Sequence, residues 1–410
     1  MKKIHFREWT VPSPRYWAVF AVLAAIVGVG LIAALYMEHE GHWVTGMNNQ
    51  IVWGMPHVFA VFLIVAASGA LNIATIGTVF GKRPFKPLGR LSGLLAVSLL
   101  AGGLLVLVLD LGRVDRLMVA MTTYNFKSIF AWNILLYNGF FVIVAAYLYT
   151  MMEPKAKKYY FSVGVLGGIW RLILTTGTGS IFGFLVARQA YDTAILAPLF
   201  IVYSFAFGLA IFMLFLFFAF AQDNREIGGK LLFRMKNVLG IFLAGVALLV
   251  LTYHLTKLYG TKYHGVEAFI LRDGGIYTIL FWVGQVAIGM LLPIAIIIHP
   301  ILSKSKGWIS GAAVMVVLGG LAAMYVIIIG GQAYPLEMFP GKTIIASGFY
   351  DGAHGAALYY SPSMPETLLG IGGFSMAILA VIIGVRMLKF LPTDLSDRAL
   401  DPHVGVKADG

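Results

Sequence analysis

Ten apolar runs, each of about 20 residues, constrain this chain more than any other feature of its sequence. An α-helix of that length crosses the roughly 30 Å of hydrocarbon in a bilayer. Because lipid offers the backbone no hydrogen-bond partner, each run is predicted to be a helix that packs on other helices. The runs lie near residues 17–37, 51–77, 91–110, 129–150, 161–186, 195–220, 238–258, 275–298, 308–331 and 367–389.

The composition agrees with this pattern. The chain has 410 residues, of which 60% are hydrophobic and 12% charged, and its mean hydropathy is +0.86. A soluble domain of this size does not need so much apolar surface, so the sequence predicts an all-α polytopic membrane protein with ten transmembrane helices. The first run follows basic residues, as in a signal peptide. Its apolar core is too long and lacks a cleavage site, so it is expected to remain as the first helix.

The basic residues are distributed unevenly between the two sides. If the N-terminus is cytoplasmic, 21 of the 30 Lys and Arg residues fall on the cytoplasmic side, 8 fall on the other side, and Arg171 lies within the fifth run. Such an excess predicts a multi-pass protein of the cytoplasmic (inner) membrane with both termini in the cytoplasm. This bias also accounts for the net charge of +12 and gives no reason to expect a nucleic-acid partner.

The order of the runs predicts two four-helix bundles between flanking helices. The expected units are residues 1–50 (cytoplasmic N-terminus, first helix and outer loop), 51–190 (first bundle), 191–331 (second bundle), 332–366 (extracytoplasmic loop) and 367–410 (last helix and cytoplasmic tail). Hydropathy leaves open a second bundle made of helices seven to ten. The long outer loop is rich in Tyr, Phe, Pro and Gly. Either a docking surface for a partner or a cap over the helix ends would explain it.

Polar side chains of the first bundle collect at one depth, near the outer ends of the helices. Asp110 is the most informative, because an ionisable group at membrane depth costs about 2.5–3.5 kcal/mol and by default marks a function. The up-and-down order of helices two to five brings it near polar residues of three other helices. The candidate site residues are Trp53, His57, Asp110, Arg113, Asn125, Ser128, Asn133, Tyr137, Thr178 and Ser180.

This set suits a quinone, which needs donors at its carbonyls, a group that exchanges protons, and access to lipid for its tail. His57 could donate to one carbonyl, and Asp110 could relay protons while Arg113 keeps it ionised. Asn133 and Tyr137, one turn apart, could position the ring. Each residue also has a structural explanation. Asp110 and Arg113 could be an interfacial ion pair, His57 a core histidine, and Asn133 a link between helices.

A second polar set lies in the C-terminal half, at His254, Gln285, Gln332 and Glu366. It predicts either a proton route or ordinary packing and helix capping. Arg171 is expected to pair with a backbone carbonyl or with an acidic group that the sequence does not identify.

Bound redox groups and metals are disfavoured. The chain has no cysteine, so it cannot ligate an iron–sulfur cluster or attach haem through thioethers, and electron transfer must use a partner's cofactors. Haem b needs histidines on facing helices, whereas His57 and His254 lie in different halves. The segment Glu38-His39-Glu40-Gly41-His42 has metal-binding residue types, but its spacing fits a solvated loop better, so no metal site is predicted.

Several segments together resemble the NrfD/PsrC family, the membrane subunits of polysulfide reductase, some hydrogenases and alternative complex III. These segments are Val52-Trp53-Gly54, Leu109-Asp110-Leu111-Gly112-Arg113, Asn125 to Ser128, and Phe281-Trp282 before Gly289 to Pro293. The likeness runs along nearly the whole chain. The DsrP branch, from the DsrMKJOP complexes of sulfur metabolism, is most similar at Gly54 to Phe59, Ala66 to Asn72 and Met324 to Pro335.

The resemblance implies a quinone-reactive oxidoreductase subunit that is not catalytic alone and binds menaquinone or ubiquinone but no covalent redox cofactor. It places the quinone in the first bundle, where Asp110, Arg113 and Ser128 match the family pattern. It also implies partners besides membrane lipid. These are an extracytoplasmic ferredoxin-like iron–sulfur subunit, a periplasmic multihaem cytochrome c, a b-type cytochrome membrane subunit and a cytoplasmic iron–sulfur subunit.

The chain departs from the family at Met324, where many members have Arg, and at Asn133 and Gln285, where many have Glu. These departures weaken the case for a proton pathway carried over from the family. Two alternatives from other classes are a secondary transporter and a passive membrane anchor. Transporters usually hold polar groups at the midplane on broken helices, whereas the polar residues here lie toward one face, which favours the redox function.

Overall fold

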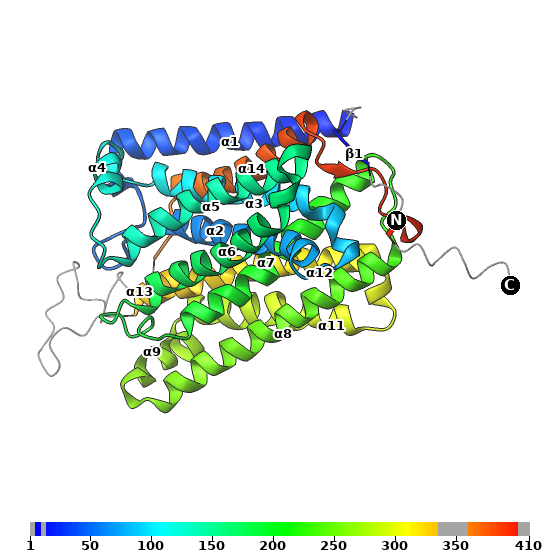
Figure 1. Ribbon diagram of the computed structural model, residues 1–410. Helices are drawn as coiled ribbons and strands as arrows, with labels where there is room; N and C mark the ends of the chain where they lie inside the picture. The colour runs from blue at the N-terminus through cyan, green and yellow to red at the C-terminus, as the bar shows by residue number, and fades with distance from the viewer. Residues whose placement is uncertain (1–4, 10–13, 335–359, 401–410) are drawn as a thin grey trace, which may run out of the picture.

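The computed structural model describes residues 5–9, 14–334 and 360–400. In this part of the chain, ten helical segments are long and apolar enough to cross a membrane, and they run side by side in one bundle (Figure 1). The predicted all-α polytopic membrane fold is confirmed. Six of the spans are single α-helices, namely α1 (Pro14–Glu40), α2 (Met55–Thr78), α5 (Ile129–Met152), α7 (Leu196–Gln222), α8 (Gly229–Tyr259) and α14 (Met364–Met387). In two more spans, α3 (Gly89–Leu109) and α6 (Tyr160–Gly183) each follow directly on a short 3-10 segment.

The other two spans change helix type along their length, which hydropathy did not predict. The eighth span consists of α10 (Ile276–Ile279), the π-helical segment η7 (Leu280–Leu291) and α11 (Leu292–Ile298). Pro293 lies in the first turn of α11 and has no N–H to continue the hydrogen bonds of η7. The ninth span consists of α12 (Lys306–Tyr325), the π-helical turn η9 (Val326–Gly330) and α13 (Gly331–Ala333).

Two helix starts differ from the predicted apolar runs. α2 begins at Met55 rather than at residue 51, because Gly54 is extended and Pro56 fits the first helical turn. Trp53 therefore lies in the loop before the helix and not within it. α8 begins at Gly229, earlier than residue 238, because its first turns carry basic residues that an apolar-run criterion leaves out.

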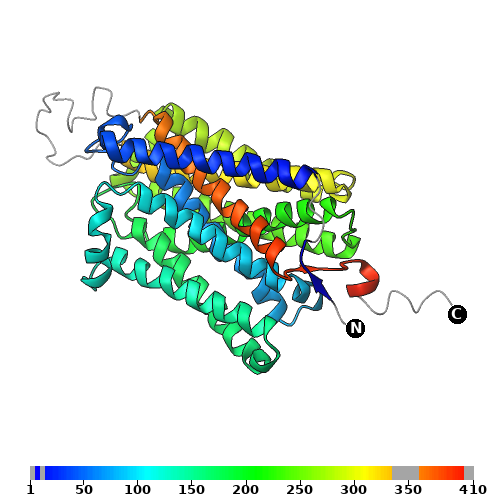
Figure 2. The same ribbon diagram turned by 90° about the horizontal axis from the view of Figure 1, so that it is seen from above.

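The core is built around α2, which is buried along nearly its whole length. It packs against α3, α6, α7 and α12. Helices α2, α3, α5 and α6 contact one another as one group, and α7, α8, η7 and α12 as a second. Helix α1 lies along α14, which in turn packs on α2 and α3 (Figure 2). The residue bounds of the five predicted units stay a prediction.

The two groups meet closely where α2 crosses α7. A Cβ added at Gly69 would overlap the carbonyl oxygen of Ser204, and one added at Gly208 would overlap the backbone of Gly69 and Ala70. Without a hydrophobic driving force in lipid, helices associate through close packing, which small residues permit. These two glycines therefore set the distance between the two groups of helices.

The first and last described segments, residues 5–9 and 391–400, lie at one end of the bundle (Figure 1). There, strand β1 (Phe6–Arg7) pairs antiparallel with strand β2 (Leu391–Pro392). Arg7 also donates a hydrogen bond to Asp223, the residue that follows α7. We call this the terminal end of the protein and the opposite end the distal end.

Short elements connect the spans. At the distal end they are η1 (His42–Val44), η3 (Val114–Arg116), α4 (Leu117–Thr122), η5 (Thr261–Tyr263), α9 (His264–Ala268) and η6 (Phe269–Asp273). At the terminal end they are η2 (Arg83–Leu88), η4 (Pro154–Tyr159) and η8 (Leu302–Lys304), and α15 (Asp397–Leu400) follows the last span. Most of the predicted outer loop of residues 332–366 lies outside the described residues, so both explanations of that loop stay predictions.

Candidate functional site

A cavity of about 370 Å³ lies between α2, α3, α5 and α6, near their distal ends. This volume is typical of sites for small organic molecules, which measure about 300–1,000 Å³. Most of the wall is apolar: Val61, Ile64, Leu104, Leu107, Val108, Leu111, Leu117, Phe130, Ile134, Ile181, Phe182 and Ile328. Six candidate residues from the sequence also line it: Trp53, His57, Asp110, Asn133, Tyr137 and Thr178.

His57 and Asp110 face each other on the cavity wall. His57 is in the first turn of α2, and Asp110 directly follows the last residue of α3, so two helix ends bring them together. His57 Nδ1 lies 3.0 Å from Asp110 Oδ2, and the Asp110 side chain is only 1% exposed. The atoms are close but not aligned as a hydrogen bond, and among the described residues neither carboxylate oxygen receives one. A buried carboxyl group therefore keeps hydrogen-bonding capacity next to an imidazole.

Asn133 is committed to the scaffold. Its amide Nδ2 donates to the carbonyl of Ile129 at 2.9 Å and to that of Gly177 at 3.1 Å, and its Oδ1 accepts from the Thr178 hydroxyl at 3.5 Å. The side chain thus joins α5 to α6, which agrees with the alternative explanation that Asn133 is a link between helices. Tyr137, one turn further along α5, is the neighbouring hydroxyl on the cavity wall.

Arg113 does not contact Asp110, although the sequence predicted that it would. Its guanidinium donates two hydrogen bonds to Asp115, at 3.0 and 2.9 Å, and its side chain is 65% exposed. The expectation that Arg113 pairs with Asp110 was wrong, because the chain leaves α3 at Asp110 and the following residues turn out to the surface. The bidentate bond from Arg113 lowers the pKa of Asp115 below its usual value.

Three further candidates lie away from the cavity. Asn125 and Ser128 precede α5, where the Asn125 side chain accepts a hydrogen bond from the backbone of Lys127. Ser180 is buried, but it is two residues beyond Thr178 and so about 200° further around α6. The apolar pattern of α6 could not show that Thr178 faces the cavity and Ser180 does not.

Gln332, from the end of the ninth span, fixes the position of Trp53. Its Oε1 accepts from the backbone N–H groups of Val52 (2.9 Å) and Trp53 (3.1 Å), and its Nε2 donates to the carbonyl of Trp53 at 3.0 Å. The Trp53 ring lies 6.2 Å from that of His57 in a stacked arrangement. The sequence marked Gln332 as a polar residue at a helix end but could not indicate this contact.

His42, which the sequence placed in a solvated loop, instead contacts the site from outside the cavity. Its Nε2 lies 3.0 Å from the backbone carbonyl oxygen of Asp110 and 3.9 Å from its Oδ1. No sequence signal linked the loop after α1 to the end of α3.

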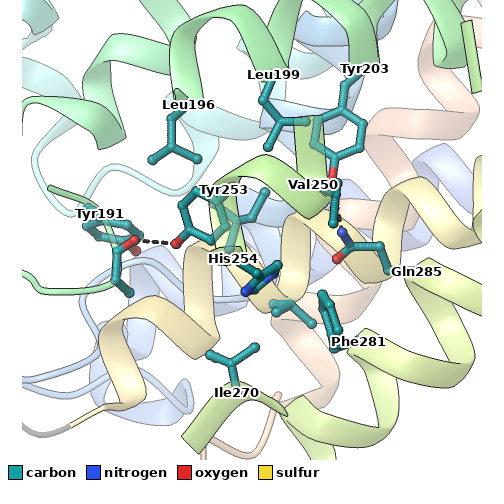
Figure 3. Close-up of a pocket in the computed structure, with 13 residues that line it drawn as sticks. Tyr191, Leu196, Leu199, Tyr203, Val250, Tyr253, His254, Ile270, Phe281 and Gln285 are labelled. Atoms are coloured by element: carbon teal, nitrogen blue, oxygen red, sulfur yellow. Dashed lines mark hydrogen bonds between the residues drawn. The ribbon is translucent and has the colours of Figure 1, made fainter. Parts of the chain in front are cut away.

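A second, much smaller cavity of about 30 Å³ lies in the second group of helices (Figure 3). It has room for one or two water molecules. Among its lining residues, Gln285 donates to the Tyr203 hydroxyl at 3.0 Å, and Tyr253 donates to the carbonyl of Ala190. His254 forms a 2.7 Å contact with the buried carboxylate of Glu267 in α9. The sequence had not singled out Glu267.

Glu366 and Arg171 serve the scaffold. Glu366, at the start of α14, accepts hydrogen bonds from the backbone of Gly46 and Ser363 at 2.8 Å each and forms a capping box with Ser363. Arg171 donates to the side-chain oxygen of Asn72 at 2.8 Å, so its partner is an amide rather than the backbone carbonyl or acidic group that was expected.

The distal surface of the second group carries an ionic contact. Asp192 accepts hydrogen bonds from Lys262 Nζ and from the Tyr263 hydroxyl, both at 2.9 Å. Burial raises the pKa of Asp192, but these two donors outweigh it, and the pKa lies below its usual value.

The sequence matches the profile of the family described as "Polysulphide reductase, NrfD" over residues 43–335. The Hdr-like menaquinol oxidoreductase integral membrane subunit of Archaeoglobus fulgidus is 28% identical, over 95% of this chain and 97% of that protein. A selenate reductase subunit of Mesobacillus selenatarsenatis is 25% identical, over 90% of this chain and 93% of its own length. A polysulfide reductase polypeptide of Wolinella succinogenes is 26% identical, over 70% of this chain and 96% of its own length.

The family match begins in the loop after α1 and ends just beyond α13, so it includes every helix that lines the cavity. The relatives align over nearly their full lengths. This chain therefore belongs to the NrfD polysulphide reductase family and is a multi-pass membrane protein.

Proposed function

We propose that this chain is the quinone-reactive membrane subunit of an oxidoreductase complex and is not catalytic alone. It exchanges electrons between membrane menaquinone or ubiquinone and iron–sulfur or haem groups of partner subunits, in sulfur-linked respiration. The observation that carries the proposal is the His57 imidazole beside the buried Asp110 carboxyl group on the wall of a mostly apolar cavity. The names of relatives, which include a menaquinol oxidoreductase and a polysulfide reductase, support it.

The chemistry of the cavity suits a quinone headgroup. Reduction turns each carbonyl of a quinone into a hydroxyl, so the site must supply or remove two protons. Imidazole and carboxyl groups do this at neutral pH, and they must lie within hydrogen-bond reach of the reacting oxygen. His57 lines the cavity and contacts Asp110 through Nδ1, which leaves its Nε2 for the headgroup. The Tyr137 hydroxyl is a further donor.

The wall between α3 and α5 would admit the isoprenoid tail. Leu104, Leu107 and Val108 of α3 and Ile134 of α5 line the cavity and are each partly exposed. In a membrane, an opening between these two helices would lead to lipid. A headgroup in the cavity can therefore leave its tail among lipid chains without crossing the protein core.

The positive-inside rule assigns a side to the cavity. The terminal end carries most of the basic residues and would face the cytoplasm, so the distal end and the cavity would face away from it. A ferredoxin-like iron–sulfur subunit on the extracytoplasmic surface would then lie nearest the quinone. The multihaem cytochrome c, b-type cytochrome and cytoplasmic iron–sulfur subunits implied by the family resemblance would extend the electron path.

The test uses the intact complex, purified from membranes, with a short-tailed naphthoquinol and the haem absorbance as the readout. Asp110→Asn and His57→Ala should each assemble but lose at least about tenfold in turnover or quinol affinity, equivalent to about 1.4 kcal/mol. Asp115→Asn changes an exposed carboxyl group of the loop after α3 and is the matched control.

If Asp110→Asn and His57→Ala both have wild-type kinetics, the result would favour the alternative that the chain is a passive membrane anchor. Flux of a small solute through liposomes that contain the complex, in the absence of quinol, would favour the transporter. A tenfold loss in the Asp115→Asn control as well would show a general effect of charge at the distal surface and would count against the assigned pair.

A further inference from the structure

Asp110 lies between two imidazoles, of which only one is in the cavity. His57 contacts its Oδ2 from the cavity side at 3.0 Å. His42 approaches from the loop after α1, with Nε2 at 3.0 Å from the Asp110 carbonyl and 3.9 Å from Oδ1. The Asp110 side chain is 1% exposed, whereas that of His42 is 25% exposed. The three residues therefore form a row from the cavity toward the distal surface, with one separation of 3.9 Å between Asp110 Oδ1 and His42 Nε2.

We propose that His42 is the outer member of a proton relay that connects Asp110 with the aqueous phase at the distal end. This inference rests on the proposed quinone chemistry and adds a residue that does not touch the quinone. Histidine is the side chain whose unperturbed protonation equilibrium lies nearest neutral pH, which suits a group that exchanges protons with water. Among the described residues, no hydrogen bond to the Nδ1 of His42 is found, and the side chain is partly exposed to solvent.

Other groups near this path are already engaged. Arg113 is bound to Asp115 at the surface, and a guanidinium does not release its proton at physiological pH. Glu366 is fully buried and accepts hydrogen bonds from Gly46, Ser363 and Tyr360. His42 is thus the titratable side chain, among the described residues, that contacts Asp110 on the side away from the cavity.

Each transfer balances in protons and electrons. When the quinol is oxidised, an O–H bond breaks. Its proton goes to the free ring nitrogen of His57, and an electron goes to an iron–sulfur or haem acceptor of a partner subunit. His57 passes its Nδ1 proton to Asp110. The carboxyl group then rotates and gives this proton to Nε2 of His42, whose ring has turned away from the Asp110 carbonyl and carries its own proton on Nδ1. Nδ1 of His42 releases that proton to water, and both rings return to their starting tautomers by rotation before the next proton. Two such cycles convert one quinol into one quinone, two protons and two electrons, and reduction follows the reverse order.

One short movement is required. At 3.9 Å, Oδ1 and Nε2 are beyond hydrogen-bond distance, which is at most about 3.2 Å for N–H···O. The His42 ring contacts the backbone carbonyl of Asp110, and it must reach the side-chain carboxyl group of the same residue. A small rotation of either side chain therefore moves the contact from one oxygen of Asp110 to another.

The experiment compares variants in the intact complex. His42→Ala should lower kcat for quinol oxidation at least about tenfold, with the quinol KM nearly unchanged. Added imidazole should restore turnover, and across a series of imidazole derivatives the restored rate should follow their basicity. His42→Gln can still donate to the Asp110 carbonyl but cannot titrate, so it should assemble normally and remain slow. His39→Ala, in an 86% exposed neighbouring histidine, is the matched control and should behave as wild type.

The outcomes separate this inference from the proposed function. If His57→Ala and Asp110→Asn are impaired while His42→Gln turns over at the wild-type rate, the relay is wrong and the quinone site stands. If His42→Ala is slow, imidazole gives no rescue and thermal stability falls, the role of His42 is structural and the relay is also overturned. If none of the three variants is impaired, the quinone site itself is wrong.

Discussion

The side-chain amide of Gln332 holds both backbone polar groups of Trp53, accepting from its N–H at 3.1 Å and donating to its carbonyl at 3.0 Å. These residues are far apart in the chain, and the contact joins the end of the ninth span to the loop before α2. Trp53 in turn lines the cavity beside His57. The second group of helices therefore helps to shape a cavity that the first group mostly encloses.

Replacing Gln332 by Leu should weaken quinol binding without preventing assembly. The change leaves the N–H groups of Val52 and Trp53 and the carbonyl of Trp53 without their partner, at a cost of about 1–3 kcal/mol for each group that stays unsatisfied. Trp53 should lose its fixed position, so the KM for quinol should rise more than kcat falls. Steady-state kinetics measure both. Asn138→Leu, which removes an amide from the exposed face of α5, is the control and should leave the KM unchanged.

Arg113→Ala should leave quinol turnover within about twofold of wild type, because the Arg113–Asp115 pair is exposed and contributes little. The family resemblance predicts the opposite, since Arg113 matches the family pattern beside Asp110. Turnover of the purified complex decides between the two. A loss as large as that of Asp110→Asn would mean that Arg113 moves to the carboxyl group during the reaction.

A bulky residue in the wall between α3 and α5 should affect long-tailed quinols more than short-tailed ones. Ile134→Trp places a large ring in this partly exposed part of the cavity lining. The KM for a long-tailed quinol should rise by about tenfold or more, roughly 1.4 kcal/mol, while that for a short-tailed analogue should change less. Val142→Trp lies on the same helix at a 69% exposed position and serves as the control. Equal effects on both quinols would argue against tail entry at this wall.

Gly208→Leu should prevent stable packing of α7 on α2, because a side chain there would overlap the backbone of Gly69 and Ala70. Overpacking of this kind typically costs about 1–3 kcal/mol, and more where backbone atoms must move. Thermal unfolding in detergent should show a lower midpoint or loss of the folded complex. Gly28→Leu, at a position on α1 with open space around it, should unfold as wild type does.

Much of the fold follows from the sequence for a simple physical reason. In lipid the backbone must satisfy its own hydrogen bonds, so each long apolar run becomes a helix, and the order of the runs decides which polar residues share an end. This reasoning brought His57, Asp110, Tyr137 and Thr178 to one cavity. It missed the π-helical segment η7, because hydropathy does not distinguish one helix type from another.

The remaining differences arise outside regular helices. Trp53 lies before α2 because of a local extended conformation at Gly54, and Arg113 turns outward because α3 ends at Leu109. The contacts of His42 and Gln332 depend on how two distant loops are placed by the whole assembly. Apolar periodicity describes single helices, so it carries no information about such contacts.

The pairing of β1 with β2 makes the backbone nearly a closed circle, since position 6 lies opposite position 392. A permuted gene that links the segment before position 6 to the segment after position 400 and opens the chain in a connection on the opposite face should preserve every helix contact. A fluorescent protein attached near either of these positions would sit on the face remote from the cavity, so it would report on expression and insertion while leaving the cavity free.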